Sequence, residues 1–262
     1  MKILFIGDIV DGPGRRLVKE RAVAVKEEYG ASLVIANVEN IAGGAGVTPD
    51  TVRQVLEAGV DVATSGNHVF AHREAVERMD EMPALVRPVN YPPGVPGRGW
   101  LVTTTPEGVK VAVINALGRV FMETVDCPFR ALDAALNVLA ARADVVVVDF
   151  HAEATSEKEA MARHLDGRVA ALIGTHTHVQ TADEGILPGG TAYITDVGMT
   201  GPLGGVIGTD AAPVLKRFIT RMPARFKPAG GDGIFSAVVV TVDGDTGLAS
   251  AIERIQIREV EP

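Results

Sequence analysis

Side chains that can bind metal ions or move protons stand directly after the apolar runs of this 262-residue chain, and four of its six histidines are among them. The densest motif is the run from Gly174 to His178, in which His176 and His178 are two positions apart and follow an apolar segment. Histidines so placed have few structural uses, which favours metal binding by this run. The residues that follow the apolar runs are Asp8, Glu39, Asn40, Asn67, His68, His151, His176 and His178.

This mixture of carboxylates, amide oxygens and imidazoles suits manganese, iron or zinc, whereas magnesium and calcium prefer oxygen ligands alone. Eight candidates exceed what one four-coordinate zinc ion needs, so the sequence predicts a centre of two metal ions ~3.5 to 4 Å apart. One carboxylate is then expected to bridge the two ions, and either Glu39 or Asp8 could do so. His176 and His178 could project to the same side and serve one ion each.

Each motif also has a simpler structural explanation when it is taken alone. Asp8 could serve a turn or a helix cap, and Glu39-Asn40 could belong to an ordinary loop. The segment from Gly66 to His68 could be a turn, and His151 could be a buried histidine paired with Asp149. These explanations together require five coincidences, because each motif follows a different predicted strand. The joint pattern therefore favours one shared site.

The elements that must position these residues are short apolar runs that alternate with amphipathic segments, which is typical of a β-sheet covered by helices. Parallel strands would bring the polar residues together, because the carboxyl ends of parallel strands share one edge of a sheet. A single α/β domain over residues 1–262, with two sheets or one large mixed sheet, fits better than two linked domains. Strands are predicted at 2–6, 33–38, 60–65, 100–105, 109–115, 144–150, 169–173, 191–195, 234–242 and 248–257. Helices are predicted at 13–30, 49–59, 70–79, 128–142, 156–165 and after Thr209.

Composition and charge exclude several classes of protein. The chain has 25 Lys and Arg against 33 Asp and Glu, a net charge of −8, and no long basic cluster, so we expect no stable binding to nucleic acid. Its only cysteine, Cys127, excludes an internal disulfide and a cysteine-based zinc site and favours a reducing compartment. No apolar run reaches the length of a membrane span or of a signal-peptide core. We therefore expect a cytoplasmic protein that does not bind membranes.

Two further segments could contribute to a substrate pocket or could be ordinary loops: the glycine-rich stretch 198–208 and the Pro/Gly stretch around Asn90. No substrate-binding residue can be assigned, and Arg119 is the nearest candidate for a phosphate contact. The segment from Gly12 to Leu17 lacks the third glycine of the dinucleotide-binding fingerprint, and no Gly-Lys-Ser/Thr motif occurs. A dinucleotide-dependent enzyme is therefore disfavoured.

The order of the motifs resembles the calcineurin-like metallophosphoesterases, in which Gly-Asn-His is followed much later by His and then by Gly-Thr-His-Thr-His. The general pattern of that superfamily has other residues at Val10, Glu39-Asn40 and Val69, but the residues found here are similar to those of its YmdB-like bacterial branch. The resemblance covers residues 2–257. It is carried by segments 7–10, 37–40, 66–69, 87–91, 149–155, 174–183 and 193–199.

The resemblance implies a four-layer α/β/β/α sandwich, the metallophosphoesterase fold, with two transition-metal ions, iron or manganese first and zinc as an alternative. It implies hydrolysis of phosphodiesters, including 2′,3′-cyclic nucleotides, by a homo-oligomer of two or four copies. One ion would be held by Asp8, Glu39, Asn40 and His178, and the other by Glu39, Asn67, His151 and His176. Glu39 would bridge the ions, and His68 would be the proton donor.

The main hypothesis is therefore metal-assisted hydrolysis of a phosphodiester. A hydroxide that bridges the two ions would attack phosphorus, and His68 would protonate the leaving alkoxide. The alternative is a regulatory protein that binds metal and nucleotide with little turnover. The complete ligand set disfavours that alternative, because an intact and open centre of two metal ions is hard to keep inert.

Overall fold

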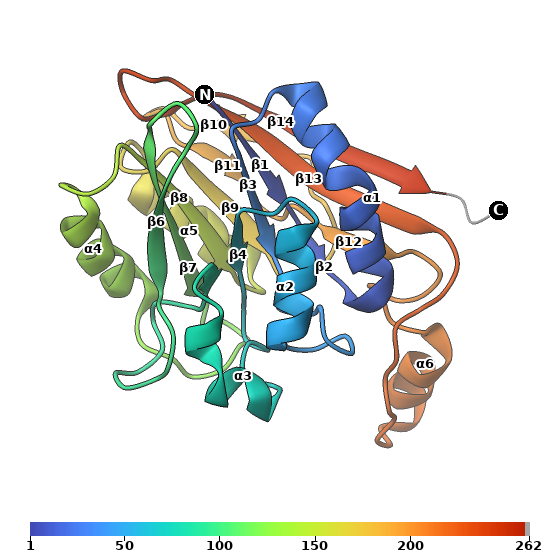
Figure 1. Cartoon of the computed structure of the whole chain (residues 1–262). Helices are drawn as coiled ribbons and strands as arrows, with labels where there is room; N and C mark the ends of the chain where they lie inside the picture. Colours follow the sequence, from blue (N-terminus) through green and yellow to red (C-terminus); the bar gives the residue numbers. More distant parts are fainter. Residues whose placement is uncertain (260–262) are drawn as a thin grey trace.

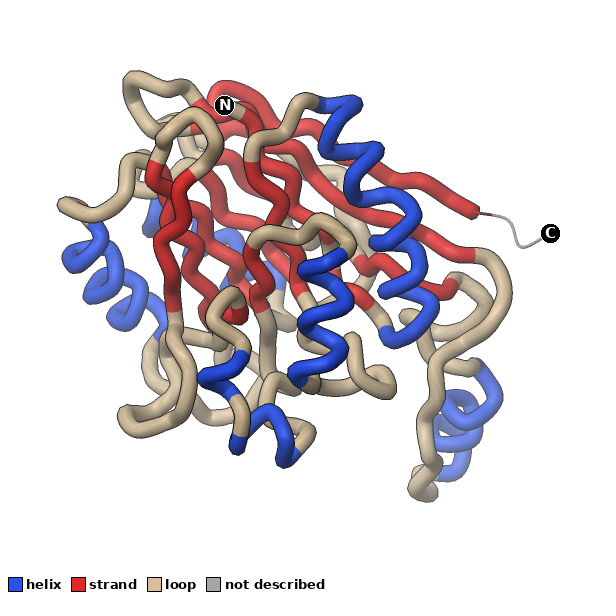
Figure 2. Tube along the Cα trace, in the orientation of Figure 1, coloured by secondary structure: helices blue, strands red, loops and turns tan. Residues whose placement is uncertain are grey.

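The apolar runs form strands whose two faces are both covered, which is why they are continuous stretches of Val, Ile and Leu. The structure is a computed structural model that describes residues 1–259 (Figures 1 and 2). One group of strands comprises β1 (Lys2–Ile6), β2 (Asp8–Ile9), β3 (Leu33–Asn37), β4 (Val62–Thr64), β5 (Leu85–Val86), β12 (Met199–Pro202), β13 (Gly233–Val242) and β14 (Ala249–Glu259). The other comprises β6 (Trp100–Thr104), β7 (Lys110–Leu117), β8 (Val145–His151), β9 (Ala171–Thr175), β10 (Gly185–Ile186) and β11 (Ala192–Ile194). The helices are α1 (Asp11–Tyr29), α2 (Pro49–Glu57), α3 (Arg73–Glu77), α4 (Pro128–Leu139), α5 (Thr155–Leu165) and α6 (Ala211–Thr220), with a 3₁₀ turn, η1, at Met79–Glu81.

The strands form two sheets. The first has the order β2-β12-β13-β1-β3-β4-β5, with β14 paired to β13, and the second has the order β10-β11-β9-β8-β7-β6. Strands β1, β3, β4 and β5 run parallel, as do β7, β8, β9 and β11, so the carboxyl ends within each set lie at one edge of its sheet. This arrangement provides the shared edges that the sequence predicted.

The two sheets pack face to face and helices cover both outer faces (Figure 1). Side chains alternate along β1, where Leu4 and Ile6 face α1 and α2 while Ile3 and Phe5 face the second sheet. On the outer face of the second sheet, β8 packs against α4 and α5. The predicted four-layer α/β/β/α sandwich is confirmed, and of the two expected arrangements the two-sheet one is present.

Local signals placed several element ends correctly. Gly30 ends α1 in the left-handed conformation, with φ of 65°. Thr48 caps α2 by accepting a hydrogen bond from the Thr51 N–H, and Pro49 occupies the first turn. Residues 1–259 include no helix that is long and apolar enough to span a membrane.

Two predicted elements differ from the structure. The helix expected at 70–79 is only the short α3 followed by η1, because residues 66–71 form turns in which the Val69 N–H donates to the Gly66 carbonyl and the Ala71 N–H to the His68 carbonyl. The glycine-rich stretch 198–208 contains β12, which pairs with β2 and β13. Its small residues suit a strand that lies close to the α1 backbone at Gly14, where a Cβ would lie 2.5 Å from the Thr200 carbonyl oxygen.

Replacing Phe5 by Ala should lower the free energy of unfolding by about 3–5 kcal/mol, because this side chain is fully buried between the two sheets. The matched control is Val23→Ala on the exposed side of α1, which should change that free energy by less than about 0.5 kcal/mol. Urea denaturation followed by circular dichroism measures both. Equal losses would contradict the inter-sheet position of Phe5.

Candidate metal centre

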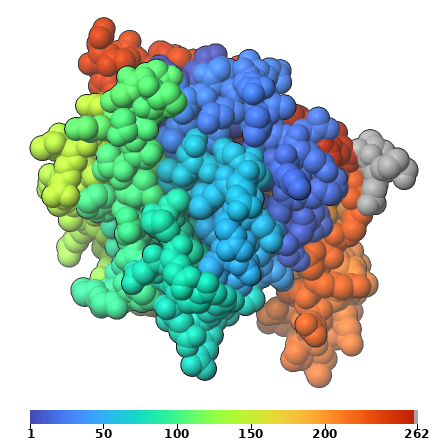
Figure 3. All heavy atoms as spheres, in the orientation of Figure 1, coloured from blue at the N-terminus to red at the C-terminus, as the bar shows by residue number. Residues whose placement is uncertain are grey.

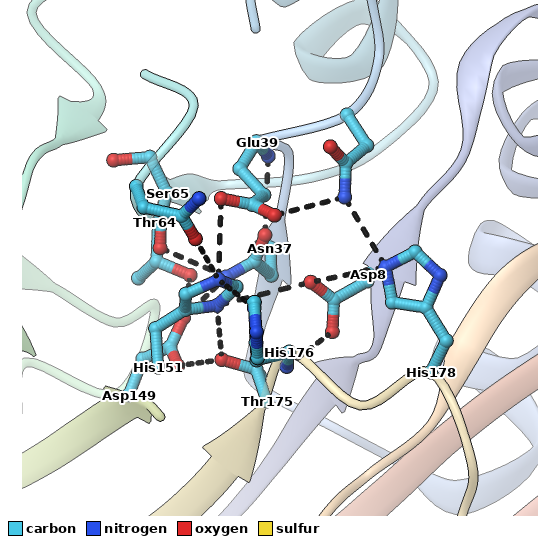
Figure 4. Close-up of polar contacts among 12 residues, drawn as sticks. Asp8, Asn37, Glu39, Thr64, Ser65, Asp149, His151, Thr175, His176 and His178 are labelled. Carbon is cyan, nitrogen blue, oxygen red and sulfur yellow. Dashed lines mark hydrogen bonds and ion pairs between the residues drawn. The ribbon is translucent and has the colours of Figure 1, made fainter. Parts of the chain in front are cut away.

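All eight predicted site residues lie in one cluster where the two sheets meet, and Figure 4 shows labelled members from both sheets pointing toward one another. Asp8 belongs to β2, Glu39 and Asn40 follow β3, Asn67 and His68 follow β4, His151 ends β8, and His176 and His178 follow β9. Asp8, Glu39 and His151 are almost completely buried. The cluster therefore depends on the packing of one sheet against the other.

Three potential ligand atoms of other residues converge on one ring nitrogen of His151. Its Nε2 lies 3.2 Å from Glu39 Oε2, 3.1 Å from Asn67 Oδ1 and 3.0 Å from His176 Nδ1. Ligand atoms of Glu39, His151 and His176 all lie within 4.8 Å of one another. This is the group that the resemblance assigns to one ion.

In the rings of His151 and His176, the outer nitrogen contacts a residue beside the cluster. The inner nitrogen is therefore left to face the cluster. The Thr175 hydroxyl donates to Asp149 over 2.7 Å, so it accepts from Nδ1–H of His151, 2.8 Å away. Nε2 of His176 lies 3.2 Å from a Glu153 carboxylate oxygen. His151 Nε2 and His176 Nδ1 face each other at 3.0 Å, and two imidazole nitrogens this close need a proton or a metal ion between them.

The simpler explanation of His151, a direct pairing with Asp149, is thus replaced by a relay through Thr175. Asp149 is fully buried and also accepts from the Asn37 amide and the Thr64 hydroxyl. Burial raises its pKa to about 6, so at neutral pH it remains a carboxylate that holds the relay in place.

A second group consists of Asp8, Glu39 and His178, whose ligand atoms also lie within 4.8 Å of one another. Nδ1–H of His178 donates to the Ile207 carbonyl over 2.9 Å, which turns Nε2 toward Asp8 Oδ1, 4.0 Å away. That oxygen of Asp8 is buried and has no hydrogen-bond partner anywhere in residues 1–259. A buried carboxylate oxygen without a donor is costly, and a cation would satisfy it.

Asn40 differs in orientation from the predicted ligand set. Its amide nitrogen, not its oxygen, faces Glu39 at 2.9 Å and His178 at 3.2 Å, while Oδ1 faces His68. Coordination of an ion by Asn40 requires the opposite orientation of the amide, because only the oxygen carries a lone pair for a metal.

The charges in the cluster favour a cation. Burial raises the pKa of the Asp8 carboxyl, whereas Glu39, in spite of burial, has a pKa well below its usual range because of His151 and His68. Burial also opposes the charged form of His151, but Glu39 and Asp8 outweigh it and raise its pKa to about 9. Burial and the neighbouring His151 lower the pKa of His176 to about 3, so its ring is neutral. The carboxylates thus hold a positive charge at this point, which a proton or a metal ion can supply, so the residues present fit a metal centre.

His68 lies at the wall of a cavity of about 650 Å³ above the cluster. Its Nδ1 is 2.9 Å from Asn40 Oδ1 and 3.4 Å from Glu39 Oε1, and its Nε2 has no protein partner among the described residues. The hydrogen bond with Glu39 raises the pKa of His68. This ring is therefore suited to hold a proton next to the cavity.

The structure also shows which of the candidate pocket segments contribute to the cavity. Ile207 and Gly208 line the cavity, so the glycine-rich stretch contributes to it. Asn90 instead braces a loop by donating to the carbonyls of Leu117 and Asp126. Arg119 is not among the residues that line the cavity, and its main-chain N–H donates to Glu157.

Two supporting residues were missed by the sequence analysis. Lys158 and Asp196 form a fully buried ion pair of 2.8 Å. Asp196 also accepts from the Thr177 N–H over 2.9 Å, which holds the turn in which His176 and His178 have φ of 103° and 65°. Asp196 directly follows the strand predicted at 191–195, the signal that marked the other site residues. Lys158 lies in a helix and carries no comparable signal.

The fold and the site together define a phosphoesterase of the metallophosphoesterase fold. The family model of the YmdB-like proteins matches residues 4–255, and the chain belongs to this family. The resemblance stated from the motifs is thereby confirmed.

Known relatives match nearly the whole chain. The chain is 47% identical over 259 residues to the 2′,3′-cyclic-nucleotide 2′-phosphodiesterase of Bacillus subtilis (strain 168), covering 99% of this chain and 98% of that protein. A crystal structure of a hypothetical protein from Thermus thermophilus superposes with a TM-score of 0.92 at 43% identity, covering 99% and 100% of the two chains. A crystal structure of a novel phosphatase from Mycoplasma pneumoniae gives a TM-score of 0.93 at 35% identity, covering 100% and 95%.

A substitution at Gly66 tests how closely the backbone must approach the cluster. A Cβ at this position would collide with Glu39 Oε2 and lie 2.5 Å from His151 Nε2, so Gly66→Ala should weaken Mn²⁺ binding by about 10- to 100-fold. Calorimetric titration with Mn²⁺ measures the change. The control Gly12→Ala, whose nearest neighbour would be an Arg15 nitrogen at 3.8 Å, should bind Mn²⁺ like the unchanged protein. Unchanged Mn²⁺ binding in Gly66→Ala would contradict the proposed arrangement of ligands.

Proposed function

We propose that this chain is a phosphodiesterase that uses two metal ions to hydrolyse small phosphodiesters, including 2′,3′-cyclic nucleotides. The observation that carries the proposal is that Glu39 belongs to both ligand groups, at the base of a cavity that His68 also lines. The relative from Bacillus subtilis, a 2′,3′-cyclic-nucleotide 2′-phosphodiesterase, supports the substrate class.

The ligands proposed for one ion are Asp8, Glu39, Asn40 and His178, and those for the other are Glu39, Asn67, His151 and His176. Iron and manganese suit this mixture of nitrogen and oxygen atoms, with zinc as an alternative. When bound, two such ions supply Lewis acidity that activates water and offsets the charge on the phosphoryl oxygens.

The chain's own residues perform the other tasks. The relay from Asp149 through Thr175 holds the His151 ring in one tautomer, and Ile207 does the same for His178. Glu39 raises the pKa of His68, which favours its protonated form, and His68 lines the cavity, where a leaving alkoxide could accept a proton from its ring.

Replacing His68 by Ala should lower kcat by about 10²- to 10⁴-fold and leave the metal content unchanged, because His68 belongs to neither ligand group. Turnover of 2′,3′-cyclic AMP and of bis-p-nitrophenyl phosphate, together with elemental analysis, measures both quantities. The control His164→Ala removes an exposed histidine of α5 that contacts Asp133 and should not affect either quantity.

A parallel loss of metal in His68→Ala would instead make His68 a ligand. If the unchanged protein binds nucleotide stoichiometrically with metal and forms no product, the regulatory alternative replaces the proposed function.

We also propose that the protein is a homo-oligomer. Large apolar side chains are exposed on and beside α6, with Phe218 at 73% and Ile219 at 79%, and such patches mark interaction surfaces. Cytoplasmic location and the absence of stable nucleic-acid binding stay predictions.

The double variant Phe218→Glu, Ile219→Glu should shift the mass of the assembly toward that of one chain, because buried carboxylates would oppose association. Light scattering after size-exclusion chromatography measures the mass. The control Val138→Glu places one carboxylate on the exposed side of α4 and should leave the mass unchanged. A monomeric unchanged protein, or an unchanged mass in the double variant, would contradict an assembly through α6.

A further inference from the structure

Residues 206–229, here called the α6 arm, form a projection whose base adjoins the cluster. The Asp210 N–H donates to the Lys227 carbonyl and the Ala229 N–H to the Gly208 carbonyl, both over 2.9 Å, so the two legs of the arm are held together. Figures 1 and 3 show this segment, in orange, standing out from the body at the lower right. The arm is linked to the cluster directly through the bond between His178 and Ile207.

The arm supplies one wall of the 650 Å³ cavity above the cluster. Arg217 of α6 and Phe226 of the returning leg both line the cavity, and the Arg217 guanidinium carbon lies 5.3 Å from the centre of the Phe226 ring. The lining of the same cavity also includes Glu39 and His68. Phe226 is 41% exposed, so its ring is not part of the buried core.

The guanidinium of Arg217 lies over the face of the Phe226 ring, so the pair offers a surface made of a positively charged group and the remaining part of an aromatic ring. Such a surface suits a nucleobase, because every base has a flat face that can stack on an aromatic ring or on a guanidinium group. The cavity volume falls within the usual range for small-molecule sites, about 300–1,000 Å³. A mononucleotide is a ligand of this size and chemistry.

The position of His68 decides on which side of the cluster the nucleoside lies. A proton donor must lie beside the leaving oxygen, and in a cyclic nucleotide this oxygen stays attached to the nucleoside. His68 lines the cavity that the arm also lines, whereas a separate, smaller hollow of about 290 Å³ is lined by Asn67, Phe121, Met122, Glu123 and His176. The nucleoside is thus expected on the side of the arm.

We propose that Arg217 and Phe226 form a nucleobase subsite that makes the enzyme prefer nucleotides to phosphodiesters without a base. This inference rests on the proposed function and adds to it a specificity-determining pair that is remote from the metal ligands. The arm then provides substrate selection, while the edge of the sheets provides the chemistry.

The test compares kcat/KM for 2′,3′-cyclic AMP with kcat/KM for methyl riboside 2′,3′-cyclic phosphate, which lacks the base. In Phe226→Ala and in Arg217→Ala the ratio of the two values should fall by about 5- to 150-fold, the contribution expected of one stacked base. Phe226→Trp should retain the ratio. The matched control is Phe121→Ala, which removes an aromatic ring that is 89% exposed at the other hollow and should leave the ratio unchanged.

A second measurement does not depend on turnover. Calorimetry should show weaker binding of 3′-AMP, relative to ribose 3-phosphate, in Phe226→Ala than in the unchanged protein. Circular dichroism, metal content and assembly mass should be unaltered in this variant, which separates loss of the subsite from loss of the fold.

The proposal is overturned if the unchanged protein hydrolyses both cyclic phosphates but the ratio is the same in Phe226→Ala and Arg217→Ala. It is also overturned if the ratio falls in Phe121→Ala instead, which would place the base in the other hollow. Failure to hydrolyse either cyclic phosphate with metal present would overturn the proposed function, and this inference with it.

Discussion

The lone pairs of two imidazoles, an amide oxygen and a carboxylate meet within about 3 Å of His151 Nε2, in a place from which most solvent is excluded. These groups are stable at such short distances only around a positive charge. The pKa of His151, which is raised to about 9, reflects the same requirement. Much of the surrounding structure serves to keep these groups in position. Thr175, Glu153 and Ile207 bind the outer ring nitrogens, and the buried pair of Lys158 and Asp196 holds the turn that carries two of the histidines.

Neither sheet contains the site alone. Glu39 comes from the first sheet and His151 from the second, and their contact of 3.2 Å exists only because the apolar inner faces of the sheets pack in one register. Phe5 and its neighbours between the sheets therefore help to position the cluster, although they do not belong to it. If the core between the sheets loosened, the cluster residues of one sheet would move away from those of the other while both sets were still buried. Stability and activity are therefore linked in this fold.

The four-layer fold was predicted through the resemblance to the metallophosphoesterases, because the apolar pattern alone left two sheets or one large mixed sheet open. The convergence of the eight polar residues followed from one local signal, a polar residue at the end of an apolar strand, which recurs at each of them. The same signal marks Asp196, which the sequence analysis missed. Lys158 could not be found in this way, since only the tertiary fold shows that one lysine of an amphipathic helix turns inward to an acid. The orientation of the Asn40 amide and the shared cavity of Phe226 with His68 depend likewise on contacts between distant segments.

We propose that Glu39 joins two cation sites into one centre. Electron paramagnetic resonance of the protein titrated with Mn²⁺ tests it most directly, because two manganese ions that share a bridging ligand are magnetically coupled. We expect two ions to bind per chain with the spectrum of a coupled pair, and Glu39→Ala should abolish the coupled signal. Binding of a single ion, or the spectrum of isolated Mn²⁺ at full occupancy, would contradict it.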